Sequence, residues 1–145
     1  MVQLSRREHS RAELREKLTG QGYQPGAVAE ALEGLAAERL LDDGRFAESF
    51  VRSHAARGQG PRRIRQDLAA AGIASDLAEQ ALGEGPDWGA LARETRRRKF
   101  GESPPADWAE RGRQARFLQY RGFSTDHIRM ALGGSEADLD LDPDP

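Results

Sequence analysis

A repeat of 50 residues runs through this chain of 145 residues and constrains its fold more than any other feature. Three segments fall into register without a gap: RAELREKLTGQGY from Arg11, PRRIRQDLAAAGI from Pro61 and GRQARFLQYRGF from Gly112. The matched sets are Leu18/Leu68/Leu118, Gly22/Gly72/Gly122, Tyr23/Ile73/Phe123, Ala31/Ala81/Ala131 and Leu32/Leu82/Leu132. Repeats of this period are typical of arrays of small structural units. The sequence therefore predicts three copies of one module.

Each copy has the pattern of a helix, a tight turn and a second helix. In the first, Ser10 and Glu13 have the spacing of a capping box, in which each side chain binds a free amide of the other residue. Gly22 is suited to the left-handed conformation that ends a helix, and the apolar Tyr23 is expected to fold back on the last turn. Pro25 fits the first turn of the second helix. In the later copies, Ser75 and Ser124 are predicted to cap that helix.

The stretch LLDDGRFAESF, which begins at Leu40, predicts the start of a third helix. Carboxylates such as those of Asp42 and Asp43 accept backbone N–H bonds at such a position and face the positive end of the helix dipole. The alternative is a calcium loop, which needs alternating oxygen ligands and a late glutamate. Here the two carboxylates are adjacent and Glu48 comes too early, so capping is favoured. Asp87 is expected to cap the third helix of the second module.

Composition favours an all-α fold. Ala, Leu, Arg and Glu, which enter helices easily, are abundant, whereas β-branched residues are scarce. The chain has no cysteine and three histidines scattered among polar neighbours, which argues against a disulfide framework and against a metal cluster. No apolar run approaches the roughly 20 residues that span a bilayer. We expect a cytoplasmic, monomeric protein without a metal site.

The predicted architecture is three tandem three-helix modules that form an elongated, curved array. The modules are assigned to residues 1–58, 59–103 and a shorter 104–134, followed by an acidic disordered tail at 135–145. Gly58–Gly60 and Gly101–Pro105 are expected to be flexible connectors. No third helix is evident after Gly133 and Gly134. An extra helix at Ala106–Gly112 is the alternative, and it could equally complete the second module.

Charge is concentrated in the middle of the chain. Residues 51–100 contain ten basic and six acidic side chains, although the whole chain has a net charge of −2. The candidate residues for binding a partner or DNA phosphate are Arg45, Arg62, Arg63, Arg65, Arg93, Arg96, Arg97, Arg98 and Lys99. Arginine binds phosphate in a bidentate manner. The alternative is a solvated helix face, and basic composition does not by itself indicate that bases are read.

Two other functional classes are disfavoured. The sequence has no catalytic triad spacing, no HExxH motif and no glycine-rich phosphate loop that follows a predicted strand, so we expect that the protein is not an enzyme. The helix–turn–helix pattern could indicate sequence-specific DNA reading. However, the second helices, VAEALEGLAAE and LAEQALGEG, are acidic or neutral, whereas a recognition helix should carry Arg, Lys, Asn or Gln on its exposed face.

Three motifs in order, REHSRAELREKL, LLDDGRFAESFVRSH and GQGPRRIRQDLAAAGI, resemble the RecX family of regulators of the RecA recombinase. The likeness extends from about Ser5 to Leu132 and includes RGFSTDHI in the third repeat. It implies a curved bacterial protein of tandem three-helix repeats that takes part in DNA repair, recombination and the SOS response.

The resemblance also implies binding along the groove of the RecA filament and lower recombinase activity, with no catalysis and no cofactor. By motif, Asp42, Asp43, Arg45, Phe46 and Ala47 match the family's DDxRFA segment, in which Arg45 is the residue suited to a partner. One departure is Gln114, which stands where the other repeats have Leu14 and Ile64. The alternative function is a helical nucleic-acid-binding protein that acts independently of RecA.

Overall fold

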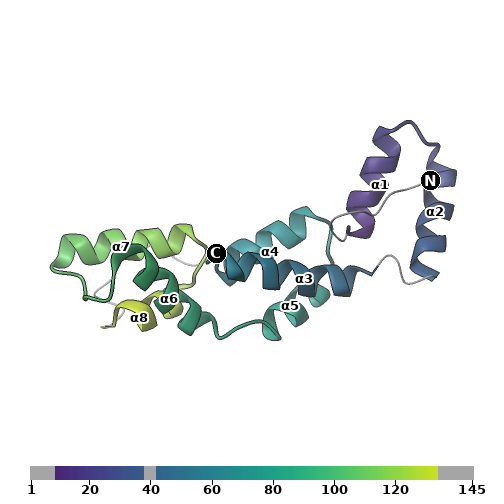
Figure 1. Cartoon of the computed structure of the whole chain (residues 1–145). Helices are drawn as coiled ribbons and strands as arrows, with labels where there is room; N and C mark the ends of the chain where they lie inside the picture. Colours follow the sequence, from purple (N-terminus) through teal and green to yellow (C-terminus); the bar gives the residue numbers. More distant parts are fainter. Residues whose placement is uncertain (1–8, 38–41, 134–145) are drawn as a thin grey trace. The chain divides into compact units, whose positions relative to one another are not determined.

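The structure, a computed structural model, describes residues 9–37 and 42–133. This part of the chain contains eight α-helices and no strand. They are α1 (Arg11–Gly20), α2 (Pro25–Ala37), α3 (Asp43–Ala56), α4 (Pro61–Ala70), α5 (Ser75–Gly83), α6 (Trp88–Phe100), α7 (Trp108–Tyr120) and α8 (Thr125–Leu132) (Figure 1). The all-α prediction is confirmed. The curved shape of the array stays a prediction, and the acidic tail at 135–145 lies outside the described residues.

The helices belong to two compact units. The first consists of Met1–Val51 and Gln66–Glu84, and the second of Arg52–Arg65 and Gly85–Pro145. Helices α3 and α4 each contribute residues to both units.

In the first unit, α1 and α2 form a small apolar core. Leu14 and Leu18 lie one turn apart on α1 and pack against Val28 and Leu32 of α2, and all four side chains are buried. The capping box of Ser10 and Glu13 is present, as predicted. The hydroxyl of Ser10 also donates a hydrogen bond of 2.6 Å to the carbonyl of Ala71. The cap therefore joins the start of α1 to the end of α4, as well as closing its own helix.

The two adjacent aspartates have different roles. Oδ1 of Asp42 accepts the backbone N–H of Arg45 at 3.0 Å, so Asp42 caps α3 as predicted. Oδ1 of Asp43 instead accepts the backbone N–H of Arg11, at 2.8 Å. Asp43 therefore satisfies a free amide at the start of α1, and one aspartate pair orders the beginnings of two helices of the first unit.

In the second unit, α8 packs along α6, and both contact α7. The core is formed by Ala92 of α6, Ala115 and Leu118 of α7, Phe123 of the turn and Ile128 of α8, each fully buried. Asp87 and Ser124 cap α6 and α8, as predicted. Asp107 caps α7.

Two predicted helix boundaries are wrong. Ser75 is the first residue of α5 rather than its cap, and the preceding Ala74 makes no capping bond through its side chain. The alternative of an extra helix at Ala106–Gly112 is also wrong, because no separate element lies there. The N-cap is Asp107, and α7 continues without a break from Trp108 to Tyr120, because Gly112 is tolerated inside a helix that its neighbours favour.

The predicted flexible connector at Gly58–Gly60 is instead packed within the second unit. The backbone N–H of Gly60 donates to the carbonyl of Arg121 at 2.8 Å, and that of Arg62 donates to the carbonyl of Gly122 at 2.9 Å. A Cβ atom on Gly60 would lie 2.5 Å from the carbonyl carbon of Gly122. Because Gly60 and Gly122 have no side chain, the backbone before α4 can lie against the backbone of the turn between α7 and α8. The positions of glycines in the sequence do not reveal this contact.

Candidate functional site

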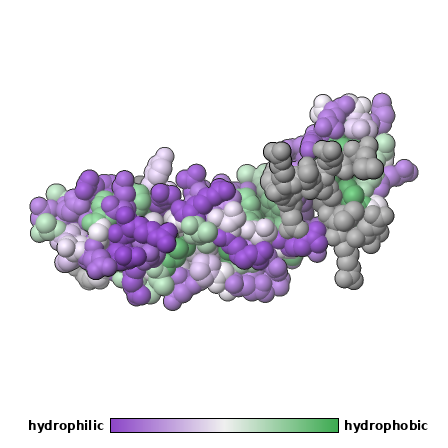
Figure 2. All heavy atoms as spheres, viewed as in Figure 1, coloured by the Kyte–Doolittle hydropathy of each residue, from purple (hydrophilic) through white to green (hydrophobic). Residues whose placement is uncertain are grey.

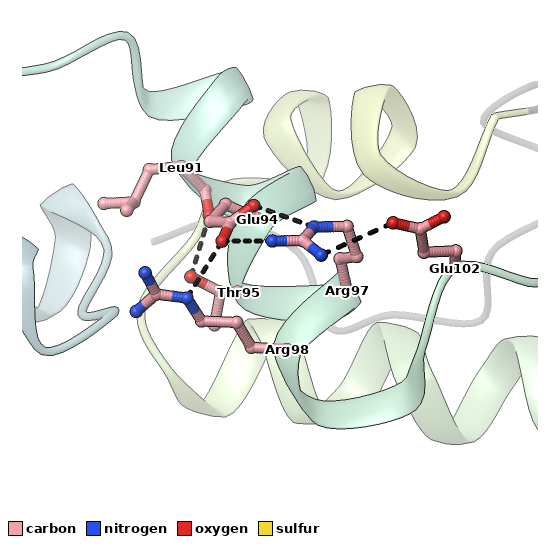
Figure 3. A network of polar contacts seen from close by, with 6 residues as sticks. All are labelled: Leu91, Glu94, Thr95, Arg97, Arg98 and Glu102. Atoms are coloured by element: carbon pink, nitrogen blue, oxygen red, sulfur yellow. Dashed lines mark hydrogen bonds and ion pairs between the residues drawn. The ribbon is translucent and has the colours of Figure 1, made fainter.

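The C-terminal half of α6 carries an ion-pair cluster around Glu94 (Figure 3). Its Oε1 accepts Nη2 of Arg97 at 2.7 Å and Nε of Arg98 at 2.9 Å, while Oε2 accepts Nε of Arg97 at 2.9 Å. Arg97 also lies 3.5 Å from the carboxylate of Glu102. Hydrogen bonds from Arg97 first, and from Arg98 next, lower the pKa of Glu94 below its ordinary value. Glu94 therefore holds two predicted binding residues in fixed orientations.

Arg96 differs from its neighbours because its side chain points inward. It is 7% exposed, and its Nε donates to Oε1 of Gln114 at 2.8 Å. Its remaining nitrogens donate to the carbonyls of Gly101 and Ser103. The guanidinium thus stabilises the segment between α6 and α7. These three acceptors within the unit occupy the guanidinium of Arg96, and we therefore exclude this residue from the candidate binding surface.

The same contact explains the departure from the repeat at Gln114. This side chain is 3% exposed, and its Nε2 donates to Oε1 of Glu110 at 3.0 Å. A buried arginine needs acceptors, because an unsatisfied buried charge is costly. The apolar residue of the other repeats could not supply one, whereas Gln114 does.

The rings of two phenylalanines, Phe100 and Phe117, form cation–π contacts with three basic side chains. The rings of Phe100 and Phe117 meet edge to face, with centroids 5.3 Å apart. The guanidinium of Arg113 lies 5.6 Å from the centroid of Phe100. The cations of Lys99 and Arg121 lie 5.8 and 5.4 Å from that of Phe117. Contacts of this kind hold basic side chains beside aromatic faces.

A cleft of about 390 Å³ opens between the end of α3, α6 and the end of α7, all in the second unit. We call it the basic cleft, and its lining residues are Ala55, Ala56, Arg57, Gly58, Leu91, Glu94, Thr95, Arg98, Lys99, Phe117 and Arg121. Four of them are basic and one is acidic. Nη1 of Arg121 donates to the carbonyl of Arg57 at 3.4 Å, and this bond connects the end of α7 to the end of α3.

The other predicted binding residues lie outside this cleft. Arg62, Arg63 and Arg65 belong to the first half of α4, where Arg63 and Arg65 are exposed and Arg62 is half-buried. Arg93 is exposed, and its Nε donates to the carbonyl of Met130 at 3.3 Å. Arg45 is exposed on α3 in the first unit. The structure therefore brings together only Arg98 and Lys99 of the predicted set in the cleft, with Arg97 alongside through Glu94.

Sequence reasoning missed Arg57, Arg113, Phe117 and Arg121. A signal was present, because Arg113, Phe117 and Arg121 are spaced at i, i+4 and i+8 and so share one face of a helix. Arg57 had no such signal, since it follows α3 and reaches the cleft only through the tertiary fold.

Figure 2 shows a hydrophilic surface broken by small apolar areas on the face in view. Across residues 9–37 and 42–133, no group of three or more His, Cys, Asp or Glu side chains is arranged to hold a metal ion. Within the same ranges, no helix has the length and apolar character needed to cross a bilayer. What the arrangement offers chemically is a set of fixed cations beside aromatic rings, suited to binding anionic groups.

Taken together, the fold defines a helical-repeat protein that presents a basic, aromatic surface. Three family models match it in order: the first three-helix domain of RecX at residues 1–35, the second at 42–82 and the third at 89–132. The chain belongs to the RecX family. These ranges group α3 with α4 and α5, and α6 with α7 and α8, so they differ by one helix from the predicted divisions at residues 58 and 103.

Relatives and solved structures agree with this membership. The chain is 50% identical over 141 residues to the regulatory protein RecX of Halorhodospira halophila, covering 97% of this chain and 88% of that one. It is 45% identical over 130 residues to the regulatory protein RecX of Chromohalobacter salexigens, covering 89% and 85%. The crystal structure of RecX from Lactobacillus salivarius superposes with a TM-score of 0.75 at 25% identity, covering 88% of this chain and 86% of that one.

Proposed function

We propose that this chain is a non-enzymatic regulator that binds RecA–DNA filaments and lowers strand exchange and ATP hydrolysis by the recombinase. The observation that carries the proposal is the ordered match of three RecX domains across residues 1–132, together with relatives named as regulatory proteins. The protein would act in the cytoplasm, as a monomer and without cofactor, in DNA repair, recombination and the SOS response.

Three small domains in tandem suit binding to a filament that repeats the same site. Once one domain has bound, the next binds as if at high local concentration, so weak contacts add up to useful affinity. An elongated, curved array would lie along the groove of the filament and span neighbouring subunits. This shape is part of the proposal.

The exposed basic residues supply the contact to DNA phosphate. Arg97, Arg98 and Lys99 follow one another at the end of α6, and Arg63 and Arg65 are exposed at the start of α4. Their charge favours binding to the DNA backbone without base recognition. Arg45 in the other unit is the candidate for contact with RecA itself.

The test is RecA-dependent strand exchange and ATP hydrolysis with increasing amounts of the purified chain. We expect both activities to fall at substoichiometric or near-equal ratios of chain to RecA. Activity that stays unchanged, together with no binding to filaments in co-sedimentation, would contradict the proposal.

Charge variants separate this function from RecA-independent binding to nucleic acid. The double substitution R98A/K99A weakens DNA binding in both cases, because phosphate contacts are lost, and it reduces the salt dependence of that binding. If the chain is a RecA regulator, the double variant retains part of its binding to filaments. If binding to DNA and to filaments is lost in equal proportion, the RecA-independent function is favoured.

A further inference from the structure

The basic cleft has more positive charge than its own carboxylate can balance. Arg57, Lys99 and Arg121 form no ion pair with any carboxylate in the described part of the chain. Glu94, the acidic residue of the lining, already accepts hydrogen bonds from Arg97 and Arg98. A cleft with a formal lining charge of +3 therefore favours an anionic occupant.

The lining also has apolar surface. Leu91, Ala55 and Ala56 lie in the same lining as the half-buried ring of Phe117. The volume of about 390 Å³ is within the range of sites that enclose several side chains. The occupant that fits best combines carboxylates with aliphatic side chains, because a purely ionic segment would leave the apolar lining in contact with water.

The segment Glu136–Asp144 of this chain has that combination. Its sequence, EADLDLDPD, places a carboxylate at every second residue and leucines at 139 and 141. In an extended backbone, alternate residues point to opposite sides. The five carboxylates would then face one way and the two leucines the other, which suits a lining that contains both cations and apolar groups.

The segment begins within reach of the cleft. Arg111 of α7 donates hydrogen bonds to the carbonyls of Leu132 and Gly133, and Met130 packs against Gly89 of α6. From Gly89 to Lys99, α6 rises by only about 15 Å. The chain from residue 134 to residue 145 can span up to about 40 Å when extended, so its acidic part can reach every cation of the lining.

We propose that the basic cleft is the docking site of the acidic segment Glu136–Asp144 of the same chain. Docking within one molecule benefits from a local concentration of roughly millimolar order, so single weak ion pairs suffice. It is screened by salt, because the Debye length falls from about 10 Å at 0.1 M to about 3 Å at 1 M.

A docked segment masks Arg57, Arg98, Lys99 and Arg121 from phosphate groups. Its release by a stronger anion exposes them, so the segment raises the threshold for binding of nucleic acid. The proposal needs neither RecA nor DNA and is tested without them.

The experiment uses the full chain with one nitroxide label. The protein has no cysteine, so Pro145→Cys provides a unique attachment point one residue beyond Asp144. Amide NMR signals are compared with the label oxidised and reduced. We expect loss of intensity at Gly58, Thr95 and Phe117 in low salt, and recovery of that intensity at 1 M salt.

Two sets of variants connect the signal loss to charge. In the labelled chain, E136Q, D138N, D140N, D142N and D144N together keep the length of the segment and remove its charge, so intensity should recover. K99E and R121E in the cleft should have the same effect. R116E is the matched control, because Arg116 is exposed on α7 outside the lining and its variant should leave the signal loss unchanged. Amide signals of α8 that keep their positions in each variant show that the unit remains folded.

Unchanged intensity at the cleft in the labelled wild-type chain would overturn the proposal. So would signal loss that persists after all five carboxylates are neutralised. A third contradicting result is that the amide signals of the cleft keep their intensity in the labelled chain but shift when a short single-stranded oligonucleotide is added. This result would assign the cleft to nucleic acid.

Discussion

The first and third repeats both have a turn in which a glycine is followed by an aromatic residue, but the aromatic side chain is buried to different extents. Tyr23, after Gly22 in the first repeat, is 50% exposed, whereas Phe123, after Gly122 in the third, is fully buried. In the second unit, α6 and α8 pack around the turn, so that Phe123 joins a core of three helices. In the first unit, the apolar cluster consists of residues of α1 and α2, without Tyr23. One repeated pattern therefore defines a local turn, and its surroundings determine what the turn contributes to stability.

Removing the two aromatic side chains gives the largest difference. Phe123→Ala empties a fully buried position and should lower the free energy of unfolding by about 3–5 kcal/mol. Tyr23→Ala should cost far less, since half of that side chain already meets water. Denaturant unfolding followed by circular dichroism measures both. Equal losses would show that the two turns have the same role.

The turn glycines provide a closely matched second comparison. Gly22 and Gly122 have φ angles of +92° and +99°. A Cβ atom on Gly22 would meet nothing within 4 Å, whereas one on Gly122 would lie 2.5 Å from Cβ of Arg63. Gly22→Ala should cost about 1–2 kcal/mol for the left-handed backbone alone. Gly122→Ala adds the clash and should be clearly more destabilising in the same unfolding experiment. If Gly122→Ala lowers the free energy of unfolding no more than Gly22→Ala does, the close contact between Gly122 and Arg63 would be contradicted.

The third comparison concerns the position at which the first two repeats have Leu14 and Ile64 and the third has Gln114. Gln114→Leu removes the acceptor of the Arg96 Nε–H, and an unsatisfied buried group costs about 1–3 kcal/mol. The double variant R96M/Q114L should recover much of that loss, because both partners are then apolar. Thermal unfolding measures the three proteins. A double variant whose loss equals the sum of the losses in Q114L and R96M would show that the two residues do not interact.

The smallest effect concerns pH. Hydrogen bonds from Arg97 and Arg98 lower the pKa of Glu94, and those from Arg113 and Gln114 lower the pKa of Glu110. A carboxyl group with a lowered folded-state pKa contributes stability above its unfolded-state pKa, and this contribution is lost as pH falls through the folded-state value. Stability should therefore decrease on acidification below the ordinary value of 4.5. The double variant E94Q/E110Q should show a shallower decrease. Both carboxyl groups are partly exposed to solvent, which screens their ion pairs, so the difference is small.

Most of the helical framework could be predicted from local patterns. The capping box at Ser10, the cap at Asp42 and the positive φ angles of Gly22, Gly72 and Gly122 follow from short-range chemistry. Tertiary contacts could not be predicted in this way. The inward direction of Arg96 depends on Gln114, 18 residues away, and the contact of Gly60 with Gly122 depends on how the second unit folds.

The same distinction applies to the candidate site. Sequence reasoning identified the basic run in α6, but adjacent arginines point in different directions around a helix. Only the structure shows that Arg96 is buried while Arg97 and Arg98 are exposed and paired with Glu94. The contribution of Arg57 to the same cleft was likewise set by the fold rather than by a motif.

Co-sedimentation of the chain with RecA filaments on single-stranded DNA tests the central claim most directly. The account predicts that the wild-type chain pellets with filaments, and that R98E/K99E pellets less while R116E matches the wild type. A wild-type chain that stays in the supernatant at every filament concentration would contradict the account.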